Sequence, residues 1–473
     1  VPGDSTSCAA PVGEWNFSEN TGTVAYDTSG NGNNGNFTNG AWKSAGFCKV
    51  GSCFGTNKSS GVQDVATITD PASGILDFSD TQDYTTEAWV KITGTAENNA
   101  GVPFYKGGPS ATQTGYDIVI NTSTGTALCG YTDGNGSGLD TATSASNNLA
   151  NGSWHFISCV MDRDGAQTGT AGLHVFVDGK KDGSDTSLTE GSAAASTENV
   201  RIGEHSDAYE YDGGVDQVRI FNYARTAAQI AWDYNQGKPV GWWKFDECQG
   251  ATANDSSGNG NSGTITIGAT VPQTAAGTCT AVDTASAWYN GRTGKFNSSL
   301  NFDGADDYVS KTSPVGLPSG ANPFTSSMWI KTSSGTSNLY LLKWGTGGTS
   351  NTMNALIYYG ATNSFSHAFY SNDLSSGANT LTSNAWNHIV ATFDGTTRRV
   401  YVNGRQTAQD TPAGVNVTAN QTLWIGTYTG AGNFFDGQID DVRVYNYALT
   451  PTQVKQIYNQ GSGIRFGPAT GTP

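Results

Sequence analysis

Apolar and polar residues alternate along residues 436–450, near the end of the chain. Charged and amide residues separate the apolar positions, which are Ile439, Val442, Val444 and Tyr447. This spacing is close to the two-residue period of a half-buried β-strand. Thr450 is a good helix N-cap and Pro451 suits the first helical position, so we expect a short helix over residues 452–458 that stops near Gly461.

The same strand-and-helix pattern occurs earlier, over residues 212–237. Other features repeat in the same order, and the matching pairs are Trp15 and Trp243, Asp27 and Asp255, Trp89 and Trp329, Trp154 and Trp386, Gly179 and Gly404, and Asp216 and Asp440. The repeating unit has about 225 residues. A unit of this length is a whole domain rather than a solenoid repeat. We therefore place two domains, at residues 1–237 and 238–473.

Short apolar runs, separated by Gly, Asn and Thr clusters, fill the rest of both copies. Long helical patterns are absent from the sequence. Aromatic residues make up 11% of the chain, which is enough for a hydrophobic core, although only 14% of residues are charged. These features predict an all-β protein of two tandem antiparallel β-sandwich domains, each ending in a short helix.

The formal net charge is −16, which argues against nucleic acid or an anionic membrane as a partner. No apolar stretch reaches the length of a transmembrane helix, so we expect no membrane insertion. The chain starts at Val1 without the segments of a secretion signal, and we expect that an export signal has been removed.

Seven cysteines are present. Cys48 and Cys53 are spaced as in a stapled hairpin, Cys129 and Cys159 lie in two strand-like runs, and Cys248 and Cys279 bracket one loop. We predict the disulfides Cys48–Cys53, Cys129–Cys159 and Cys248–Cys279, and with them an oxidising compartment. Cys8 is left over. Pairing of Cys8 with Cys48 is an alternative, and reduced buried thiols are another.

The second copy carries a specific series of motifs. They are Trp-x-Phe at 243–245, Asp-x-Ser-Gly-Asn-Gly-Asn at 255–261, Phe-Asp-Gly-Ala-Asp-Asp-Tyr-Val at 302–309, Trp-Asn-His at 386–388, Asn-Gly at 403–404, and Gly-x-Ile-Asp-x-Val-Arg-x-Tyr-Asn at 437–446. The first copy has Cys53–Asn57 in place of the 302–309 motif. In this order the motifs resemble those of laminin G-like (LamG) jelly-roll domains in the concanavalin A-like lectin/glucanase superfamily.

This resemblance covers nearly the whole chain, as two copies. It implies two curved antiparallel sheets in each domain. It also implies a secreted or cell-surface location, frequent Ca²⁺ binding, and a role as an adhesive or glycan-binding module. The tandem arrangement of the two copies resembles that of LamG-like domains on bacterial surface and pilin-like proteins.

Each copy combines an acidic residue on its last strand with a loop rich in glycine and asparagine. Carboxylate, amide and backbone oxygens suit Ca²⁺, and glycines let a loop turn its carbonyls inward. We therefore predict one Ca²⁺ ion per domain, with the ligands Asp27, Asn31, Asn33 and Asp216 in the first domain and Asp255, Asn259, Asn261 and Asp440 in the second. Alternatively, the loop is only a turn, and the two strand acids face solvent or pair with Arg219 and Arg443.

Glucanases of the superfamily use two carboxylates on one strand. The nearest run here is 204–210, whose spacing does not match and which we interpret as a solvated loop. We therefore predict a protein that is not an enzyme. Aromatic residues in or beside the expected loops could stack on sugars, although most aromatics of a sandwich belong to its core. They are Tyr209, Tyr211, Tyr358, Tyr359, Tyr428, Phe434 and Phe435.

The sequence thus predicts an extracellular or cell-surface binding or adhesion protein with Ca²⁺-supported, lectin-like modules that recognise a glycan or a cell-surface protein. The first alternative is a structural subunit of an extracellular filament or surface layer that self-associates through sheet edges. The second is an enzyme that acts on polysaccharides.

Overall fold

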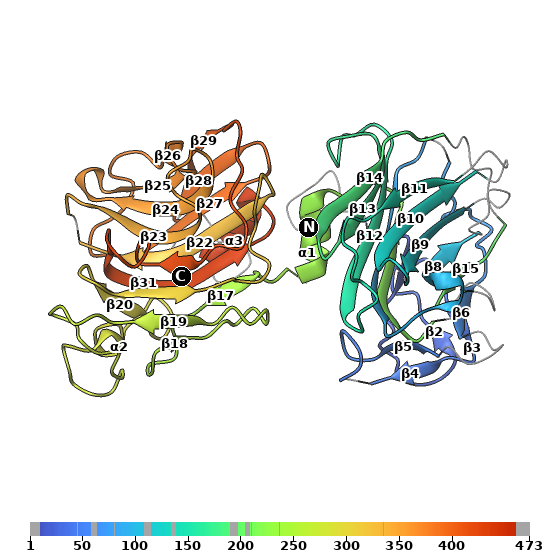
Figure 1. Cartoon of the computed structure of the whole chain (residues 1–473), viewed down its shortest axis with the longest axis horizontal. Coiled ribbons are helices and arrows are strands. Elements are labelled where there is room, and N and C mark those ends of the chain that lie inside the picture. Colours follow the sequence, from blue (N-terminus) through green and yellow to red (C-terminus); the bar gives the residue numbers. More distant parts are fainter. Residues whose placement is uncertain are drawn as a thin grey trace, which may run out of the picture. The chain divides into compact units, whose positions relative to one another are not determined.

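The computed structural model describes residues 10–44, 46–57, 64–79, 81–107, 115–133, 139–189, 197–203, 209, 211–235, 237–333 and 335–459. The chain divides into two compact units, Thr6–Tyr234 and Asn235–Pro473, which we call domain 1 and domain 2. Each is a sandwich of two antiparallel sheets (Figure 1). The prediction of an all-β fold with two tandem antiparallel sandwiches is confirmed.

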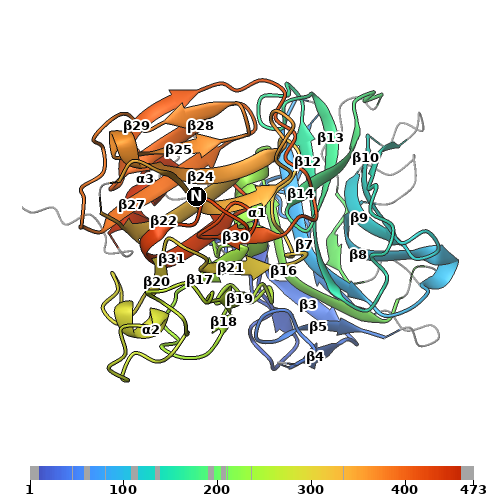
Figure 2. The same ribbon diagram turned by 60° about the vertical axis from the view of Figure 1, so that its left-hand side comes forward.

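In each domain a helix covers the outer face of one sheet, which we call the helix-covered sheet; the other is the opposite sheet. In domain 1 the helix-covered sheet has the order β14 (Lys180–Asp185), β13 (Gly172–Val177), β12 (Trp154–Asp162), β7 (Tyr84–Ile92), β16 (Gly213–Phe221), β5 (Cys53–Thr56) and β4 (Ala41–Lys43), with β1 (Gly13–Trp15) also on β16. Figure 2 shows β12, β7 and β16 side by side. The opposite sheet has the order β11 (Asp140–Thr143), β10 (Thr126–Thr132), β9 (Gly115–Asn121), β8 (Ala100–Lys106), β15 (Val200–Ile202), β6 (Val65–Ile68), β3 (Gly35–Thr38) and β2 (Val24–Ala25).

Domain 2 repeats this plan. Its helix-covered sheet has the order β17 (Gly241–Trp243), β31 (Asp436–Tyr445), β22 (Phe324–Lys331), β27 (Asn387–Phe393), β28 (Arg398–Val402) and β29 (Arg405–Asp410), with β20 (Leu300–Asp303) also on β31. Its opposite sheet has the order β18 (Thr252–Ala253), β19 (Gly263–Thr266), β21 (Tyr308–Lys311), β30 (Leu423–Ile425), β23 (Asn338–Gly345), β24 (Met353–Tyr359), β25 (Ser364–Ala368) and β26 (Asp373–Ser375).

The last strand of each domain contains a β-bulge. Ile439, Val442 and Val444 all reach the core, although the first two are three residues apart. Strict alternation would place Ile439 and Val442 on opposite faces. An extra residue, Asp441 with φ 51°, absorbs the mismatch and shifts the register. Gln217, with φ 48°, has the same role in β16.

Short helices follow both last strands, as predicted. They are α1 (Ala227–Asn235) and α3 (Pro451–Tyr458), and domain 2 also contains α2 (Ala287–Asn290); η1 (Glu97–Asn99) and η2 (Gly360–Thr362) are single 3₁₀ turns. Thr450 caps α3 by accepting a hydrogen bond from the Gln453 amide, in a complete capping box. The predicted stop at Gly461 lies outside the described residues. Among the helices described, none has the length and apolar character needed to cross a bilayer.

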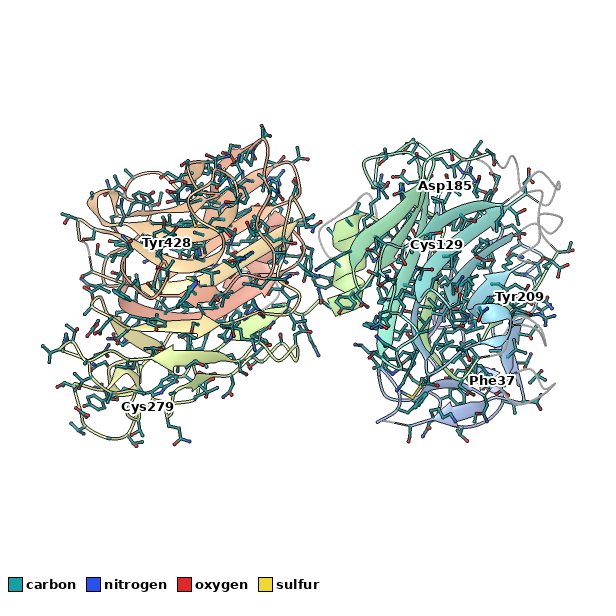
Figure 3. The ribbon with its side chains drawn as sticks, in the orientation of Figure 1. Phe37, Cys129, Asp185, Tyr209, Cys279 and Tyr428 are labelled. Atoms are coloured by element: carbon teal, nitrogen blue, oxygen red, sulfur yellow. A yellow bond between two sulfur atoms is a disulfide. The ribbon has the colours of Figure 1, made fainter. Side chains whose placement is uncertain are left out.

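Each sandwich encloses a large apolar cluster. The three predicted disulfides are all formed. Cys129–Cys159 (Figure 3) joins β10 to β12 through the core and so links the two sheets of domain 1. Because Cys48 bonds to Cys53, the alternative pair Cys8–Cys48 is wrong. Cys8 lies outside the described residues.

Candidate functional site

The two predicted loop carboxylates are occupied by their own loops. Asp255 Oδ1 accepts hydrogen bonds from the Trp242 and Ser257 amides at 3.0 and 2.9 Å, and Oδ2 accepts one from the Asn261 amide at 2.8 Å. In domain 1, Asp27 accepts hydrogen bonds from the amides of Glu14, Ser29 and Asn33 at 2.9–3.0 Å. N–H groups therefore point at the oxygens that a cation would need.

The asparagine side chains are also in use. Asn31 and Asn33 donate from Nδ2 to the Val12 carbonyl, at 3.1 and 3.2 Å. The equivalent donors, Asn259 and Asn261, reach the Val240 carbonyl at 3.2 and 2.9 Å. These bonds tie each loop to the residue just before the first strand of its domain, which is the function of a structural turn.

Asp216 and Asp440 lie at the bulges and point to other segments. Asp440 Oδ2 accepts a hydrogen bond from the Phe296 amide at 2.8 Å, and Asp216 Oδ2 accepts one from the Val50 amide at 2.9 Å. Both residues are fully buried, and Oδ1 of each lacks a hydrogen-bond partner. The expectation that these acids face solvent, or pair with Arg219 and Arg443, is therefore wrong.

The eight predicted ligands thus form four local groups rather than two four-ligand sites. The loop groups do not fit a Ca²⁺ ion, because their carboxylates are saturated with N–H donors and their amide nitrogens hold backbone carbonyls. Each strand acid offers one free oxygen, which is far short of the six to eight that Ca²⁺ takes. Calcium binding by this protein stays a prediction.

Domain 2 has a cavity of about 480 Å³ beside Asp440, lined by Trp242, Lys244, Asp246, Phe296, Asp440, Asp441, Arg443, Gln456 and Ile457. Asp441 accepts a hydrogen bond from Trp242 Nε1 at 2.7 Å and pairs with Arg443 at 2.8 Å. Lys244 Nζ and the Arg443 guanidinium lie 4.3 and 4.7 Å from the centre of the Trp242 ring. The charged side chains of Lys244 and Arg443 therefore already lie against the Trp242 ring, an aromatic surface of this cavity.

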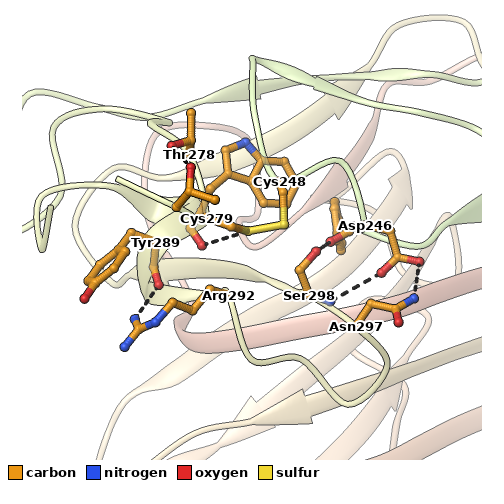
Figure 4. The surroundings of a disulfide bond; sticks show 12 residues. Asp246, Cys248, Thr278, Cys279, Tyr289, Arg292, Asn297 and Ser298 are labelled. Atoms are coloured by element: carbon orange, nitrogen blue, oxygen red, sulfur yellow. Dashed lines mark hydrogen bonds between the residues drawn. A yellow bond between two sulfur atoms is a disulfide. The ribbon is translucent and has the colours of Figure 1, made fainter. Parts of the chain in front are cut away.

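The loop that contributes Phe296 to this cavity also contains Asn297 and Ser298, which are held close to the Cys248–Cys279 disulfide (Figure 4). Asp246 accepts hydrogen bonds from Asn297 Nδ2 at 3.2 Å and from the Ser298 amide at 3.4 Å. The Ser298 hydroxyl donates to the Phe245 carbonyl at 2.7 Å. These contacts hold the segment that presents the Phe296 amide to Asp440.

Four tyrosines gather on the outer face of the opposite sheet of domain 2. Along β24, Leu356 and Tyr358 point into the core, whereas Met353, Ala355 and Ile357 point outward and form a separate apolar cluster with Ala368. Tyr340, Tyr359, Tyr370 and Tyr428 pack against that cluster and stay partly exposed. We use the name tyrosine face for ten residues: the four of this apolar cluster, the four tyrosines, and the adjacent Lys343 and Asp373.

The side chains of the tyrosine face contact one another. The rings of Tyr340 and Tyr428 are 4.9 Å apart, and the Tyr359 hydroxyl donates to Asp373 Oδ2 at 3.1 Å. Burial raises the pKa of Tyr340 to about 12, and burial followed by the charge of Asp373 raises the pKa of Tyr359 to about 12. Both hydroxyls therefore stay protonated at neutral pH and can donate hydrogen bonds.

The side chain of Tyr428, labelled in Figure 3, lies close against Gly347. A Cβ atom at residue 347 would lie 1.7 Å from the Tyr428 hydroxyl oxygen. A side chain at that position would therefore displace Tyr428 from the face.

Five of the seven aromatic residues singled out from the sequence belong to two groups, the tyrosine face and the buried side chains. Tyr359 and Tyr428 belong to the tyrosine face, and Phe434 lies beside Tyr308 at 6.5 Å. The side chains of Tyr211, Tyr358 and Phe435 are buried. Tyr209 belongs to neither group. Tyr340 and Tyr370 were missed, because only the pairing of β23, β24 and β25 brings them together.

Two clusters of three acids also occur, Asp83–Asp162–Asp164 and Asp303–Asp306–Asp307. In the second, Asp307 accepts hydrogen bonds from the Gly268 and Asp303 amides and from Gln273 Nε2. Burial, and then the neighbouring Asp303, raise the pKa of Asp307 to about 6. Hydrogen bonding to loop amides accounts for this cluster. The run 204–210, considered for catalysis, lies outside the described residues except for Tyr209.

Comparison with protein families shows which superfamily the chain belongs to. The laminin G family model described as concanavalin A-like lectin/glucanases superfamily matches residues 60–231 and 303–455. The chain belongs to this superfamily. It carries two laminin G-like domains, as the sequence motifs indicated. A search of curated proteins found no match.

Solved structures similar to this chain include domain 4 of AbnA, an extracellular GH43 arabinanase from Geobacillus stearothermophilus, in complex with arabinotriose. It is 23% identical, with a TM-score of 0.35 over 47% of this chain and 98% of that chain. Domains LG4-5 of the mouse laminin α1 chain are 10% identical, with a TM-score of 0.27 over 86% and 93% of the two chains. The CBM40 of Ruminococcus gnavus IT-sialidase, bound to α2,3-sialyllactose, is 18% identical, with a TM-score of 0.26 over 29% and 83%. These likenesses carry no argument about the ligand of this chain.

Proposed function

We propose that this chain is a secreted, non-catalytic glycan-binding protein and that the tyrosine face of domain 2 is its glycan platform. The observation that carries the proposal is the gathering of Tyr340, Tyr359, Tyr370 and Tyr428 on one partly exposed sheet face. Aromatic rings with polar tips provide flat apolar surface for the faces of sugar rings, and their hydroxyls provide hydrogen bonds. The three disulfides support an extracellular location.

The proposal of binding without hydrolysis rests on the charges of the same face. Glycoside hydrolysis takes two carboxyl groups roughly 5–9.5 Å apart around the scissile bond. The tyrosine face has one carboxylate, Asp373, which accepts a hydrogen bond from Tyr359. We expect no release of reducing ends when the protein is incubated with a panel of polysaccharides. Release that disappears in Asp373→Asn would contradict this part of the proposal.

The test of the platform is glycan-array binding by the full chain, followed by titration of the strongest oligosaccharide. We expect the double variant Tyr340→Ala/Tyr428→Ala to lose at least about tenfold in affinity, because aromatic anchors dominate binding surfaces of this kind. The matched control is Tyr289→Ala, which removes a partly exposed tyrosine on α2 in the same domain.

Affinity that is as high in the double variant as in the Tyr289→Ala control would place the site elsewhere. If the wild-type chain binds no oligosaccharide on the array, the proposed function itself is wrong. Circular dichroism of each variant establishes that a loss of binding does not come from unfolding. The structural role in a filament or surface layer, with self-association, stays the alternative prediction.

A further inference from the structure

We propose that the glycan held by the tyrosine face carries a carboxylate, as uronic and sialic acids do, and that Lys343 is the residue that binds it. This inference rests on the proposed function, because it names the class of sugar taken by the same face. Its basis is the position of one ammonium group and the charges around it.

Lys343 lies on β23, within the tyrosine face. It is paired in register with Trp424 of β30 on one side and with Ala355 of β24 on the other. Its Nζ atom lies 5.2 Å from the centre of the Tyr428 ring. The residue is only 6% exposed, so most of the lysine stem is buried.

The ammonium of Lys343 has no ion-pair or hydrogen-bond partner among the described residues of domain 2. Buried lysines are almost always paired, and Lys106 in domain 1 follows this rule with Asp70 at 2.6 Å and Asp77 at 2.9 Å. Desolvation lowers the pKa of Lys343. A carboxylate on a bound sugar would provide the missing counter-charge for this ammonium, next to the Tyr428 ring.

General electrostatic attraction does not explain such a preference. The chain has a formal net charge of −16, so its overall field disfavours anions. The single carboxylate of the face, Asp373, is engaged by Tyr359. Selection of an acidic sugar would therefore depend on the short-range contact with Lys343.

Domain 1 does not repeat this feature. The strand register places Tyr105 at the position of Lys343, since Tyr105 pairs with Arg201, the middle residue of β15, and Lys343 pairs with Trp424, the middle residue of β30. Asp117 occupies the position of Ala355, and burial raises the pKa of Asp117 to about 7. A face with a tyrosine in place of the lysine and an acid on the next strand is unsuited to a carboxylated ligand, so we assign the site to domain 2 alone.

The test compares two pairs of probes that differ in the carboxylate: sialyllactose against lactose, and oligogalacturonides against their carboxyl-reduced products. Binding to the full chain is measured by calorimetry at fixed ionic strength. We expect the wild type to prefer the acidic member of a pair about tenfold or more, since a hydrogen bond to a charged group contributes that much to affinity. Lys343→Met should remove the preference by weakening binding of the acidic member about tenfold.

Lys455→Met is the charge-matched control, because Lys455 is exposed on α3 and its loss changes the net charge equally. Methionine matches the length of the buried lysine stem, so the Lys343 variant is expected to fold. Equal binding of acidic and neutral probes by the wild type, or a preference that survives in Lys343→Met, would overturn the inference and leave glycan binding intact. Absence of binding to any probe would overturn it as well, and only the array and the tyrosine variants then decide the proposed function.

Discussion

In domain 1 the space between β16 and helix α1 holds buried charges, whereas the corresponding space in domain 2 contains the cavity beside Trp242. Arg225 pairs with Asp233 and lies 3.4 Å from Glu87, which is fully buried. Arg219 reaches Glu14 at 2.9 Å and Asp233 at 3.4 Å. Burial raises the pKa of Glu87, and the neighbouring Asp233 raises it further.

Domain 2 keeps the same backbone contacts with different side chains. The amide of Arg225 donates to Thr85 Oγ1, and the amide of Leu449 donates to Thr325 Oγ1 at 2.8 Å, so Leu449 takes the place of Arg225. By the same register Ser327, Ile457 and Trp242 replace Glu87, Asp233 and Glu14. The fold thus needs the strand, bulge and helix at this place, and it accepts either the charged Glu87, Arg225 and Asp233 or the uncharged Ser327, Leu449 and Ile457 between them.

Removal of one member of the charge network should have the largest effect on stability. Arg225→Leu puts the domain 2 residue into domain 1 but leaves the fully buried Glu87 without its Arg225 partner and leaves Asp233 with Arg219 alone. We expect a loss of about 3–5 kcal/mol in the free energy of unfolding. The triple variant Glu87→Ser/Arg225→Leu/Asp233→Ile, which copies domain 2 at these three positions, should recover most of that loss.

Denaturant unfolding of the full chain measures the change, and hydrogen exchange localises it to domain 1. If Arg225→Leu and the triple variant are equally unstable, the two domains are not interchangeable at this place and the comparison fails.

The sheets of the two domains are also fastened differently. Cys129 and Cys159 join β10 to β12 in domain 1. The register places His367 and Ala391 at these positions in domain 2. His367 is fully buried and its Nε2 lies 2.6 Å from Asn354 Oδ1. Burial lowers the pKa of His367, and the nearby Arg398 lowers it further, so a neutral imidazole fills the place of the disulfide.

Removal of the inter-sheet disulfide by Cys129→Ala/Cys159→Ala should destabilise domain 1 by about 3 kcal/mol. The matched control is Cys248→Ala/Cys279→Ala, since the two disulfides close loops of 30 and 31 residues. Hydrogen exchange should show faster opening of β10 and β12 in the first variant, and faster opening near α2 in the control. Unchanged exchange in β10 would mean that the apolar core alone holds the two sheets together.

The duplication made much of this architecture predictable. Repeated strand patterns, the Thr450–Pro451 helix start and the cysteine spacings each depend on local chemistry, and the structure confirms them. The bulge was missed although its signal is present, because Ile439 and Val442 cannot both face the core in a regular strand.

The candidate site was less predictable for two physical reasons. Asp27 and Asp255 have the residue types of a Ca²⁺ site, but the sequence does not reveal that backbone N–H groups fill their oxygens. The tyrosine face depends on the register between strands that are far apart in the chain. Its local signal is the alternation of Met353, Ala355, Ile357 and Tyr359, which separates an outward row from the core residues between them.

Substitution of the two bulge acids, Asp216 and Asp440, should have the smallest effect on the free energy of unfolding. It also gives the most direct comparison of the two domains. Burial raises the pKa of Asp216 to about 7 and that of Asp440 to about 8; Lys49 opposes the shift at Asp216, whereas Asp441 and Asp246 add to it at Asp440. Because the folded protein holds these protons more tightly than the unfolded chain, stability is greatest near pH 4 and falls as the pH rises to about 7 for Asp216 and about 8 for Asp440.

Asp216→Asn and Asp440→Asn keep a neutral acceptor for the Val50 and Phe296 amides, so each should flatten this decline and gain on the order of 1–2 kcal/mol at the upper end of its range. Denaturant unfolding from pH 4 to pH 9 measures both slopes, and a decline in Asp440→Asn identical to that of the wild type would show that Asp440 is ionised throughout this range.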